Sequence, residues 1–387
     1  MRPFNYYQPT SIHFGTGKLN DVATVVGQYG KRCFLVTGKS NALAAAFTKI
    51  TKLLTDAGIA VHHYAGATPN PTLDDVTLGT EQAIAFKADV ILGVGGGSTI
   101  DVAKAIAVQA THEGNAFDYL YYSPKQPTTK TLPIVAISTT SGTGTHTSKV
   151  AVITRNEDKH KSAIASPYIF AKAAIVDPEL MVTLPENVTA STGWDAFTHT
   201  FESYLNTNHN PYVDLLCLEA IKLVKTNLPI VLTDSNNLEA RAAMALADTY
   251  AGMCIANVGT IMPHAMGQAI SGHFPHVSHG QSLAVIYPEF TRFTYESAID
   301  RFATVGRIFN PALQSENDDT AARQCCEEID AFLKQINMWF TLDSLQVDQA
   351  EMPGIIKHCM AFPDSQASPK VPTEQDIIAL YNKARTH

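Results

Sequence analysis

Four side chains in the second half of the sequence have the types and spacing to hold a metal ion. Asp195 and His199 are four residues apart, so on a helix both would lie on one face. His264 and His279 follow in two separate segments. One carboxylate and three imidazoles could surround one divalent cation, and that set suits iron(II) or zinc. The same residues could instead cap helices or be hydrogen-bonded within a core.

Two stretches rich in glycine and hydroxyl groups follow apolar runs of the kind that form strands. Gly96, Gly97 and Ser98 open an expected helix, where the backbone could approach a pyrophosphate at the positive end of the helix dipole. Thr139, Thr140 and Thr143 belong to the second stretch, residues 138–145. Nucleotides bind at the carboxyl ends of parallel strands, so we expect both stretches to face one crevice. A plain turn is the alternative for each.

Further positions bear on a dinucleotide. Asp101 suits a helix cap, a ribose or a nicotinamide group better than a phosphate. Gly38, Lys39 and Ser40 end the first strong strand, where an acid would bind the 2′-hydroxyl of NAD. Glycine and lysine leave room and positive charge for a 2′-phosphate, which favours NADP(H) over NAD(H), with a solvated Lys39 as the alternative. Asn70 could reach the cofactor or simply make its turn.

The pattern of expected elements changes near residue 185. Residues 1–184 alternate apolar runs with helical spacing, which predicts βαβ units and a parallel sheet. Residues 185–387 show helix after helix. The expected fold class is an α/β dinucleotide-binding domain followed by an all-α metal-binding and substrate domain, with the binding cleft between them. The expected strands are 33–37, 60–64, 90–94 and 134–137, and the expected helices of the second domain are 191–205, 212–225, 238–255, 297–308, 320–335, 349–360 and 373–383.

Composition excludes several classes of function. The 387-residue chain has a net charge of −8 and no basic stripe, which argues against a nucleic-acid partner. No segment approaches the ~18 consecutive apolar residues of a membrane helix, and the first residues lack the apolar region of a signal peptide. Six cysteines without a Cys-x-x-Cys pair indicate reduced thiols. We therefore expect a soluble cytoplasmic protein.

Together these motifs resemble the iron-containing, group III alcohol dehydrogenases over essentially the whole chain. The residues that carry the resemblance are Asn70, Pro71, Thr72, Gly95–Ser98, Asp101, Ala103, Lys104, Thr139, Thr140, Gly142–Gly144, Asp177, Pro178, Leu180, Gly193, Asp195, Ala196, His199, Glu202, His264, His279 and Gly280. The resemblance implies that Asp195, His199, His264 and His279 hold the metal. It also implies cofactor contacts at Gly97, Ser98, Thr139, Thr140, Thr143, Lys161 and Leu180.

The activity implied is hydride transfer between a short or medium primary alcohol, or a diol, and NAD(P), with NADP favoured. Many family members carry a histidine four residues after the third ligand, where this chain has Gln268. The proton would then leave through His273 or His276, a water chain or the cofactor ribose. Trp194 and Phe274 could line an apolar substrate pocket or belong to the core.

Other interpretations stay open. A glycerol or lactaldehyde-type polyol dehydrogenase would use NAD and zinc. A nucleotide-binding relative without catalysis would lack one of the ligands or the glycine loop, and both are present. A serine hydrolase would need a Gly-x-Ser-x-Gly elbow, which is missing. Residues 6–14 resemble an edge strand that family members pair across a dimer, so we expect a homodimer.

Overall fold

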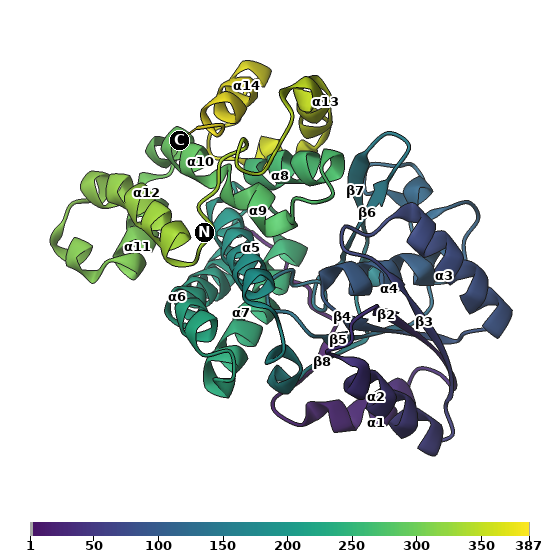
Figure 1. Cartoon of the computed structure of the whole chain (residues 1–387). Helices are drawn as coiled ribbons and strands as arrows, with labels where there is room; N and C mark the ends of the chain where they lie inside the picture. Colours follow the sequence, from purple (N-terminus) through teal and green to yellow (C-terminus); the bar gives the residue numbers. More distant parts are fainter. Residues whose placement is uncertain (1–2, 387) are drawn as a thin grey trace. The chain divides into compact units, whose positions relative to one another are not determined.

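The computed structural model describes residues 3–386 and separates into two compact units. Residues 7–184 form one unit, and residues 185–386 together with residues 3–6 form the other (Figure 1).

A six-stranded sheet, parallel throughout, forms the centre of the first unit. Its strand order is β1-β8-β5-β4-β2-β3. The central strands are continuous apolar runs because helices cover both faces of the sheet. Their bounds are β1 (Ser11–Phe14), β2 (Arg32–Gly38), β3 (Ala60–Ala67), β4 (Val90–Gly95), β5 (Ile134–Ser138) and β8 (Ala173–Val176).

Helices cover the two faces in pairs (Figure 1). Successive strand residues point to opposite faces, so Phe34 and Leu35 of β2 lie in different cores. Phe34 packs in the core that α3 (Leu73–Phe86) and α4 (Gly97–Gln109) share with the sheet. Leu35 packs in the core of α1 (Val22–Val26) and α2 (Ala44–Asp56). This alternation confirms the predicted parallel α/β layer.

An antiparallel hairpin was not among the elements expected from the sequence. It consists of β6 (Val150–Arg155) and β7 (His160–Ala165). Its turn is Asn156-Glu-Asp-Lys159, in which Lys159 has a left-handed φ of 57°. The asparagine and the aspartate are typical turn residues and could have indicated this turn from the sequence. Short 3-10 helices punctuate the chain at η1 (Lys18–Asp21), η2 (Ala116–Tyr119), η3 (Pro167–Ile169), η4 (Pro178–Met181), η5 (Tyr295–Ser297), η6 (Pro311–Ser315), η7 (Gln349–Glu351) and η8 (Pro363–Ala367).

The second unit is built from helices, as predicted. Their bounds are α5 (Glu186–Leu205), α6 (Pro211–Thr233), α7 (Leu238–Asn257), α8 (Met262–His273), α9 (His279–Ala284), α10 (Tyr287–Thr294), α11 (Ile299–Phe309), α12 (Asp318–Gln335), α13 (Met352–Ala361) and α14 (Glu374–Lys383). The set expected from periodicity lacks α8, α9 and α10. Helices α8 and α9 are buried nearly all round, so no polar face marks their period, and α9 and α10 are only 6 and 8 residues long.

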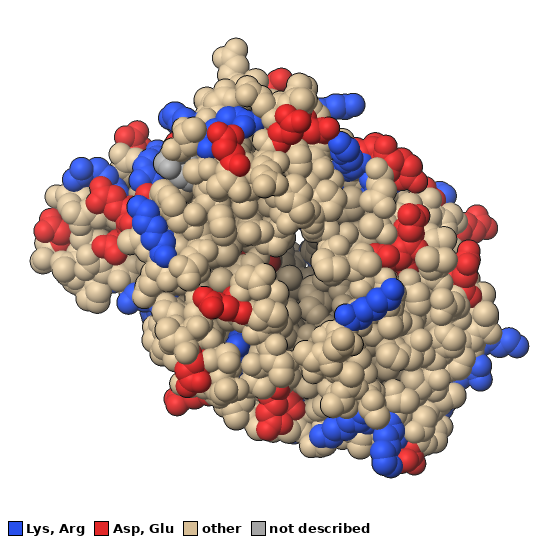
Figure 2. Space-filling view, in the orientation of Figure 1, with Lys and Arg blue, Asp and Glu red and all other residues tan. Residues whose placement is uncertain are grey.

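The structure also bears on membrane crossing, on surface charge and on the state of the cysteines. No helix in the part of the chain that the structure describes combines the length and apolar character needed to cross a membrane. On the face seen in Figure 2, basic and acidic side chains are interspersed. All six cysteines are free thiols and buried.

Candidate functional site

Helix α5 supplies two members of a buried polar cluster. Asp195 and His199 lie one turn apart on it, and both are buried. His264 lies in the first turn of α8, directly after Pro263. His279 is the first residue of α9, which Ser278 caps through a capping box with Gln281.

Three imidazoles surround one carboxylate oxygen. Oδ1 of Asp195 lies 3.8 Å from Nδ1 of His199, 3.7 Å from Nε2 of His264 and 3.6 Å from Nε2 of His279. Possible ligand atoms of Asp195, His199 and His264 all lie within 4.8 Å of one another. The structure therefore brings together the four residues proposed from sequence.

The cluster fits a divalent cation. Oδ1 of Asp195 and Nε2 of His264 are buried and have no hydrogen-bond partner within the described chain. Buried polar atoms normally find a partner, because leaving them unpaired costs about 1–3 kcal/mol. Ligand atoms about 2.1 Å from a tetrahedral cation are roughly 3.4 Å apart, close to the distances seen here. One oxygen and three nitrogens suit iron(II) or zinc.

Behind the cluster, Glu202 orients the imidazole of His264. Its fully buried carboxylate accepts hydrogen bonds from Nδ1 of His264 at 2.7 Å, the Ile261 amide at 2.9 Å and the Tyr287 hydroxyl at 3.2 Å. With Nδ1 donating to Glu202, Nε2 of His264 is left facing Asp195. Burial raises the pKa of Tyr287, so its hydroxyl stays a donor.

The ionisable groups of the cluster shift one another's pKa values. Burial opposes protonation of His264, but Glu202 and Asp195 outweigh it and raise the pKa of His264 to about 10. Burial also opposes charge on Asp195, yet the nearby imidazoles, led by His199, lower its pKa to about 2. The two carboxylates thus favour positive charge at the centre of the cluster.

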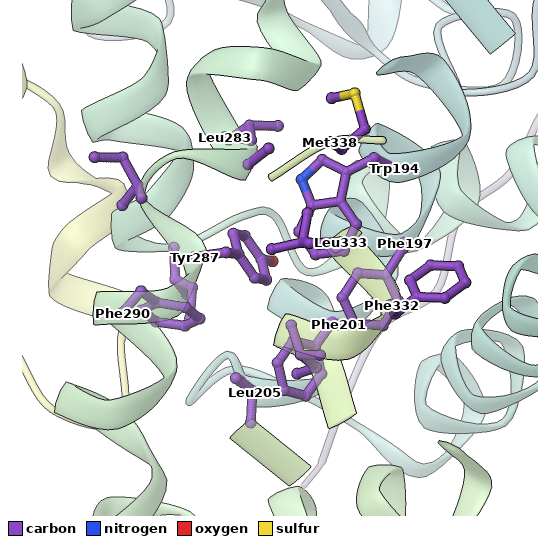
Figure 3. Close-up of a cluster of buried hydrophobic side chains, with 14 of the residues drawn as sticks. Trp194, Phe197, Phe201, Leu205, Leu283, Tyr287, Phe290, Phe332, Leu333 and Met338 are labelled. Carbon is purple, nitrogen blue, oxygen red and sulfur yellow. The ribbon is translucent and has the colours of Figure 1, made fainter. Parts of the chain in front are cut away.

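Trp194 and Phe274 belong to the hydrophobic core rather than to a demonstrable substrate pocket. Trp194 is fully buried, and its indole packs edge-on against Tyr287 and tilted against Phe197, with centroid distances of 4.9 Å in both pairs (Figure 3). Phe274 is half-buried and packs against the same core. The suggestion that Trp194 lines an apolar pocket is wrong, because aromatic side chains enclose it.

His273, which we expected to relay the proton, has partners at both ring nitrogens. Its Nδ1 pairs with Glu351 at 2.8 Å and its Nε2 with His358 at 3.0 Å, so both ring nitrogens are engaged. It also lies nine residues after His264 on α8, about 13.5 Å along the helix axis. His276 is engaged as well, because its Nε2 lies 3.0 Å from the Leu345 carbonyl.

Gln268 lies one helical turn after His264, on the same face of α8. Its Oε1 is buried and has no hydrogen-bond partner among the described residues. The amide cannot exchange a proton at neutral pH, but it can accept a hydrogen bond.

In the first unit, the two glycine-rich stretches interlock. Strand β4 ends at Gly95, whose carbonyl accepts a hydrogen bond from the Thr139 amide at 3.0 Å. Gly96 is the N-cap of α4, and no side chain caps this end of the helix. A Cβ at Gly96 would come within 2.9 Å of Thr140, and one at Gly97 would clash with Thr143. Glycine is therefore required where the two loops meet.

This junction fits an anionic ligand. The first amides of α4 carry no side-chain cap, and Oγ1 of Thr140 is buried with no partner in residues 3–386. Gly38 ends β2, which pairs with β4, and a Cβ there would lie 3.7 Å from Oγ1 of Thr99 in α4. Lys39 is exposed and Ser40 half-buried just beyond it. The proposed dinucleotide positions 38–40, 96–98 and 139–143 thus share one edge of the sheet.

Other proposed cofactor residues have partners within the unit. Asn70 adopts a left-handed φ of 52°, and its Oδ1 accepts a hydrogen bond from Nζ of Lys161 at 2.9 Å. Leu180, in η4, is buried in the core under β5 and β8.

Asp101 is not the helix cap considered from sequence, since α4 begins four residues earlier. Its carboxylate instead accepts hydrogen bonds from Thr145 Oγ1 at 2.6 Å and the Val152 amide at 3.0 Å. Both oxygens of Asp101 are therefore used inside the chain.

Comparison with known proteins places both units in one family. The family model "Iron-containing alcohol dehydrogenase" matches residues 9–178, and its C-terminal counterpart, "Fe-containing alcohol dehydrogenase family, C-terminal", matches residues 189–385. This chain belongs to the iron-containing alcohol dehydrogenase family. The resemblance seen in the motifs is confirmed, and the match supports an alcohol dehydrogenase.

Individual members of this family match over nearly full length. The chain is 31% identical to long-chain-alcohol dehydrogenase 1 of Geobacillus thermodenitrificans, covering 97% of this chain and 95% of that one. It is 29% identical to the NAD-dependent methanol dehydrogenase of Bacillus methanolicus, covering 98% and 99%. The solved structure of the archaeal Red Sea brine pool alcohol dehydrogenase ADH/D1 superposes with a TM-score of 0.95 at 31% identity, covering 99% and 100%. These matches confirm the predicted fold class.

Proposed function

We propose that this chain interconverts a short or medium primary alcohol, or a diol, and the corresponding aldehyde, using a divalent metal and NAD(P). The observation that carries the proposal is the buried cluster of Asp195, His199, His264 and His279, in which an unpaired carboxylate oxygen faces an unpaired imidazole nitrogen. Family membership supports the reaction class.

Asp195, His199, His264 and His279 would hold the cation, and we propose iron(II), with zinc as the alternative. A bound divalent cation would act as a Lewis acid that favours the deprotonated alcohol over the neutral one. Glu202 keeps Nε2 of His264 turned towards the cluster through the 2.7 Å contact with Nδ1. Asp195, His199 and His264 are buried, and their removal from water strengthens the electrostatic interactions among them.

Gln268 would hold the substrate without exchanging a proton. Its buried Oε1 can accept a hydrogen bond from a hydroxyl group, and it lies one turn from His264. Because an amide has no titration near neutral pH, the proton would pass to a water chain or the cofactor ribose.

The dinucleotide would lie along the edge of the sheet where β2, β4 and β5 end. A bound nicotinamide accepts or supplies the hydride. The uncapped amides at the start of α4 would donate to the pyrophosphate, and Thr140 would add its buried hydroxyl. Cofactor contacts are proposed at Gly38, Lys39, Ser40, Asn70, Gly96, Gly97, Ser98, Thr139, Thr140, Thr143, Lys161 and Leu180.

NADP(H) is favoured over NAD(H) in this proposal. No acid stands at Gly38 to bind a 2′-hydroxyl, and the exposed ammonium of Lys39 has no acidic partner among residues 3–386. The methanol dehydrogenase relative is NAD-dependent, so both dinucleotides belong in the test.

We further propose a cytoplasmic homodimer. Six free, buried thiols suit a reducing compartment, and β1 forms one edge of the sheet, where a second copy could pair.

The direct test follows oxidation of NADPH and NADH with a panel of short aldehydes, before and after chelation and after return of iron(II) or zinc. We expect chelation to abolish turnover and metal to restore it. Asp195→Asn and His264→Ala should lose metal and turnover, whereas Glu186→Gln, at the exposed start of α5, should lose neither. Full metal content and turnover in a folded Asp195→Asn variant would show that Asp195 does not hold the metal and would contradict the proposed site.

A further inference from the structure

A lysine is buried in the first unit, on the helix that follows the first glycine-rich stretch. Lys104 lies in the middle of α4 and is fully buried. Its Nζ donates hydrogen bonds to the carbonyls of Thr145 at 2.7 Å, Ser148 at 2.8 Å and Val150 at 2.8 Å. An ammonium has three hydrogens, so these three carbonyls use its donor capacity completely.

Two of these carbonyls, those of Thr145 and Ser148, belong to the segment that connects β5 with β6, and the third belongs to Val150, the first residue of β6. This segment, residues 139–149, has no regular secondary structure, so its backbone groups need partners from elsewhere. Asp101, one turn before Lys104 on α4, accepts one hydrogen bond from the hydroxyl of Thr145 in the segment and another from the amide of Val152 in β6. Lys104 and Asp101, on one face of α4, therefore hold the C-terminal end of the segment through hydrogen bonds to Thr145 and Ser148.

The near end of the segment meets the glycine turn. The Thr139 amide donates to the Gly95 carbonyl, and Thr140 and Thr143 lie where Cβ atoms of Gly96 and Gly97 would be. The segment is thus anchored at both ends on α4 and the turn that begins it. A shift at its far end would move the hydroxyls of Thr140 and Thr143 relative to the first amides of α4.

We propose that Lys104 is a positioning residue for dinucleotide binding, because its ammonium fixes residues 139–149 against α4 and so sets the hydroxyls of Thr140 and Thr143. The inference rests on the proposed function, since it assumes that the dinucleotide lies at this junction. An alkyl side chain of similar length would fill the same space but leave three carbonyls without a donor. An arginine would keep the charge, but its planar guanidinium cannot reproduce three converging donors.

The experiment compares Lys104→Met, Lys104→Arg and a matched control, Ile106→Ala. Ile106 is buried on the same helix and forms no side-chain hydrogen bond, so its truncation destabilises the unit without releasing the segment. For each variant of the metal-loaded enzyme, we would measure the melting temperature, the Kd of NADPH and NADH by fluorescence, and hydrogen exchange over residues 139–149.

The expected result separates binding from stability. Lys104→Met should bind the reduced dinucleotide about tenfold or more weakly than wild type, with faster exchange confined to residues 139–149. Lys104→Arg should recover part of the affinity, whereas Ile106→Ala should lose melting temperature but keep its Kd within about twofold of wild type. Metal content should stay unchanged in all three.

Two outcomes would overturn the inference. One is wild-type Kd in Lys104→Met, and the other is an equal loss of affinity in Ile106→Ala. If Lys104→Met does not fold, Lys104→Arg decides instead, because it keeps the charge but cannot reproduce the three converging donors, and a wild-type Kd in that variant would overturn the inference. Failure of the wild-type enzyme to bind either dinucleotide would instead overturn the proposed function and this inference with it.

Discussion

The carboxylate of Glu202 and the imidazole of His264 lie 2.7 Å apart, from Oε1 to Nδ1, and both are buried within the helical unit. This contact decides which nitrogen of the ring faces Asp195. Removing one acceptor charge from Glu202 should therefore change metal binding without altering any proposed ligand.

Glu202→Gln is expected to weaken metal affinity about 10- to 100-fold, because a carboxylate that holds a ligating imidazole contributes to its orientation and basicity. Chelator competition at fixed pH measures this, with Glu186→Gln as the control on the same helix. Unchanged metal affinity in a folded Glu202→Gln variant would show that the charge of Glu202 does not contribute to metal binding.

Gln268→His should place a titratable group one turn from His264. We expect turnover near neutral pH to rise about tenfold or more, with a new limb in the pH–rate profile near pH 6.5, because general acid–base groups act best close to the working pH. Gln268→Asn is the control and should add no limb. A histidine variant with the wild-type profile would place residue 268 outside the proton path.

Gly38→Asp should change the choice of dinucleotide. A Cβ at Gly38 would come within 3.2 Å of the Ala67 carbonyl, a tight contact that a small backbone adjustment relieves. The new carboxylate would repel a 2′-phosphate and accept a hydrogen bond from a 2′-hydroxyl. We expect the ratio of kcat/KM for NADPH over NADH to fall about tenfold or more. Lys39→Met, as a companion variant, should lower the same ratio by removing charge alone, and an unchanged ratio in both variants would contradict a 2′-phosphate at this position.

His146 makes the stability of the first unit depend on pH. Burial, followed by repulsion from Lys104, lowers the pKa of His146 to about 3, compared with 6.5 for an exposed histidine. In the unfolded chain, His146 therefore binds a proton below about pH 6.5, whereas in the folded chain it binds one only near pH 3. The stability from the neutral, buried ring is complete above pH 6.5 and is lost as the pH falls towards 3.

We expect this group to remove roughly 2 kcal/mol of unfolding free energy between pH 6.5 and pH 5. Urea unfolding at both pH values measures the loss for wild type and for His146→Gln, which has no titration in this range. The variant should be less sensitive to pH by about that amount. Equal pH sensitivity in both proteins would mean that His146 is protonated in the folded state.

The sequence by itself determined the family and the layer architecture of this protein. Apolar strands such as 90–94, each followed by a loop and a helix, have few ways to bury both faces other than a parallel sheet, and the structure has that sheet. The spacing of Asp195 and His199 was enough to place them on one helical face, because helical geometry is local.

Only the tertiary structure decided what depends on contacts between distant segments. His264 and His279 lie on short helices whose periodicity is masked by burial on every side, so their approach to Asp195 could be proposed only from residue types and resemblance. The tertiary structure also decided which residues considered for the proton path or the substrate pocket are held by contacts within the fold. His273 is paired with Glu351 and His358, and Trp194 is enclosed by aromatic side chains, since long-range packing determines which polar groups stay available.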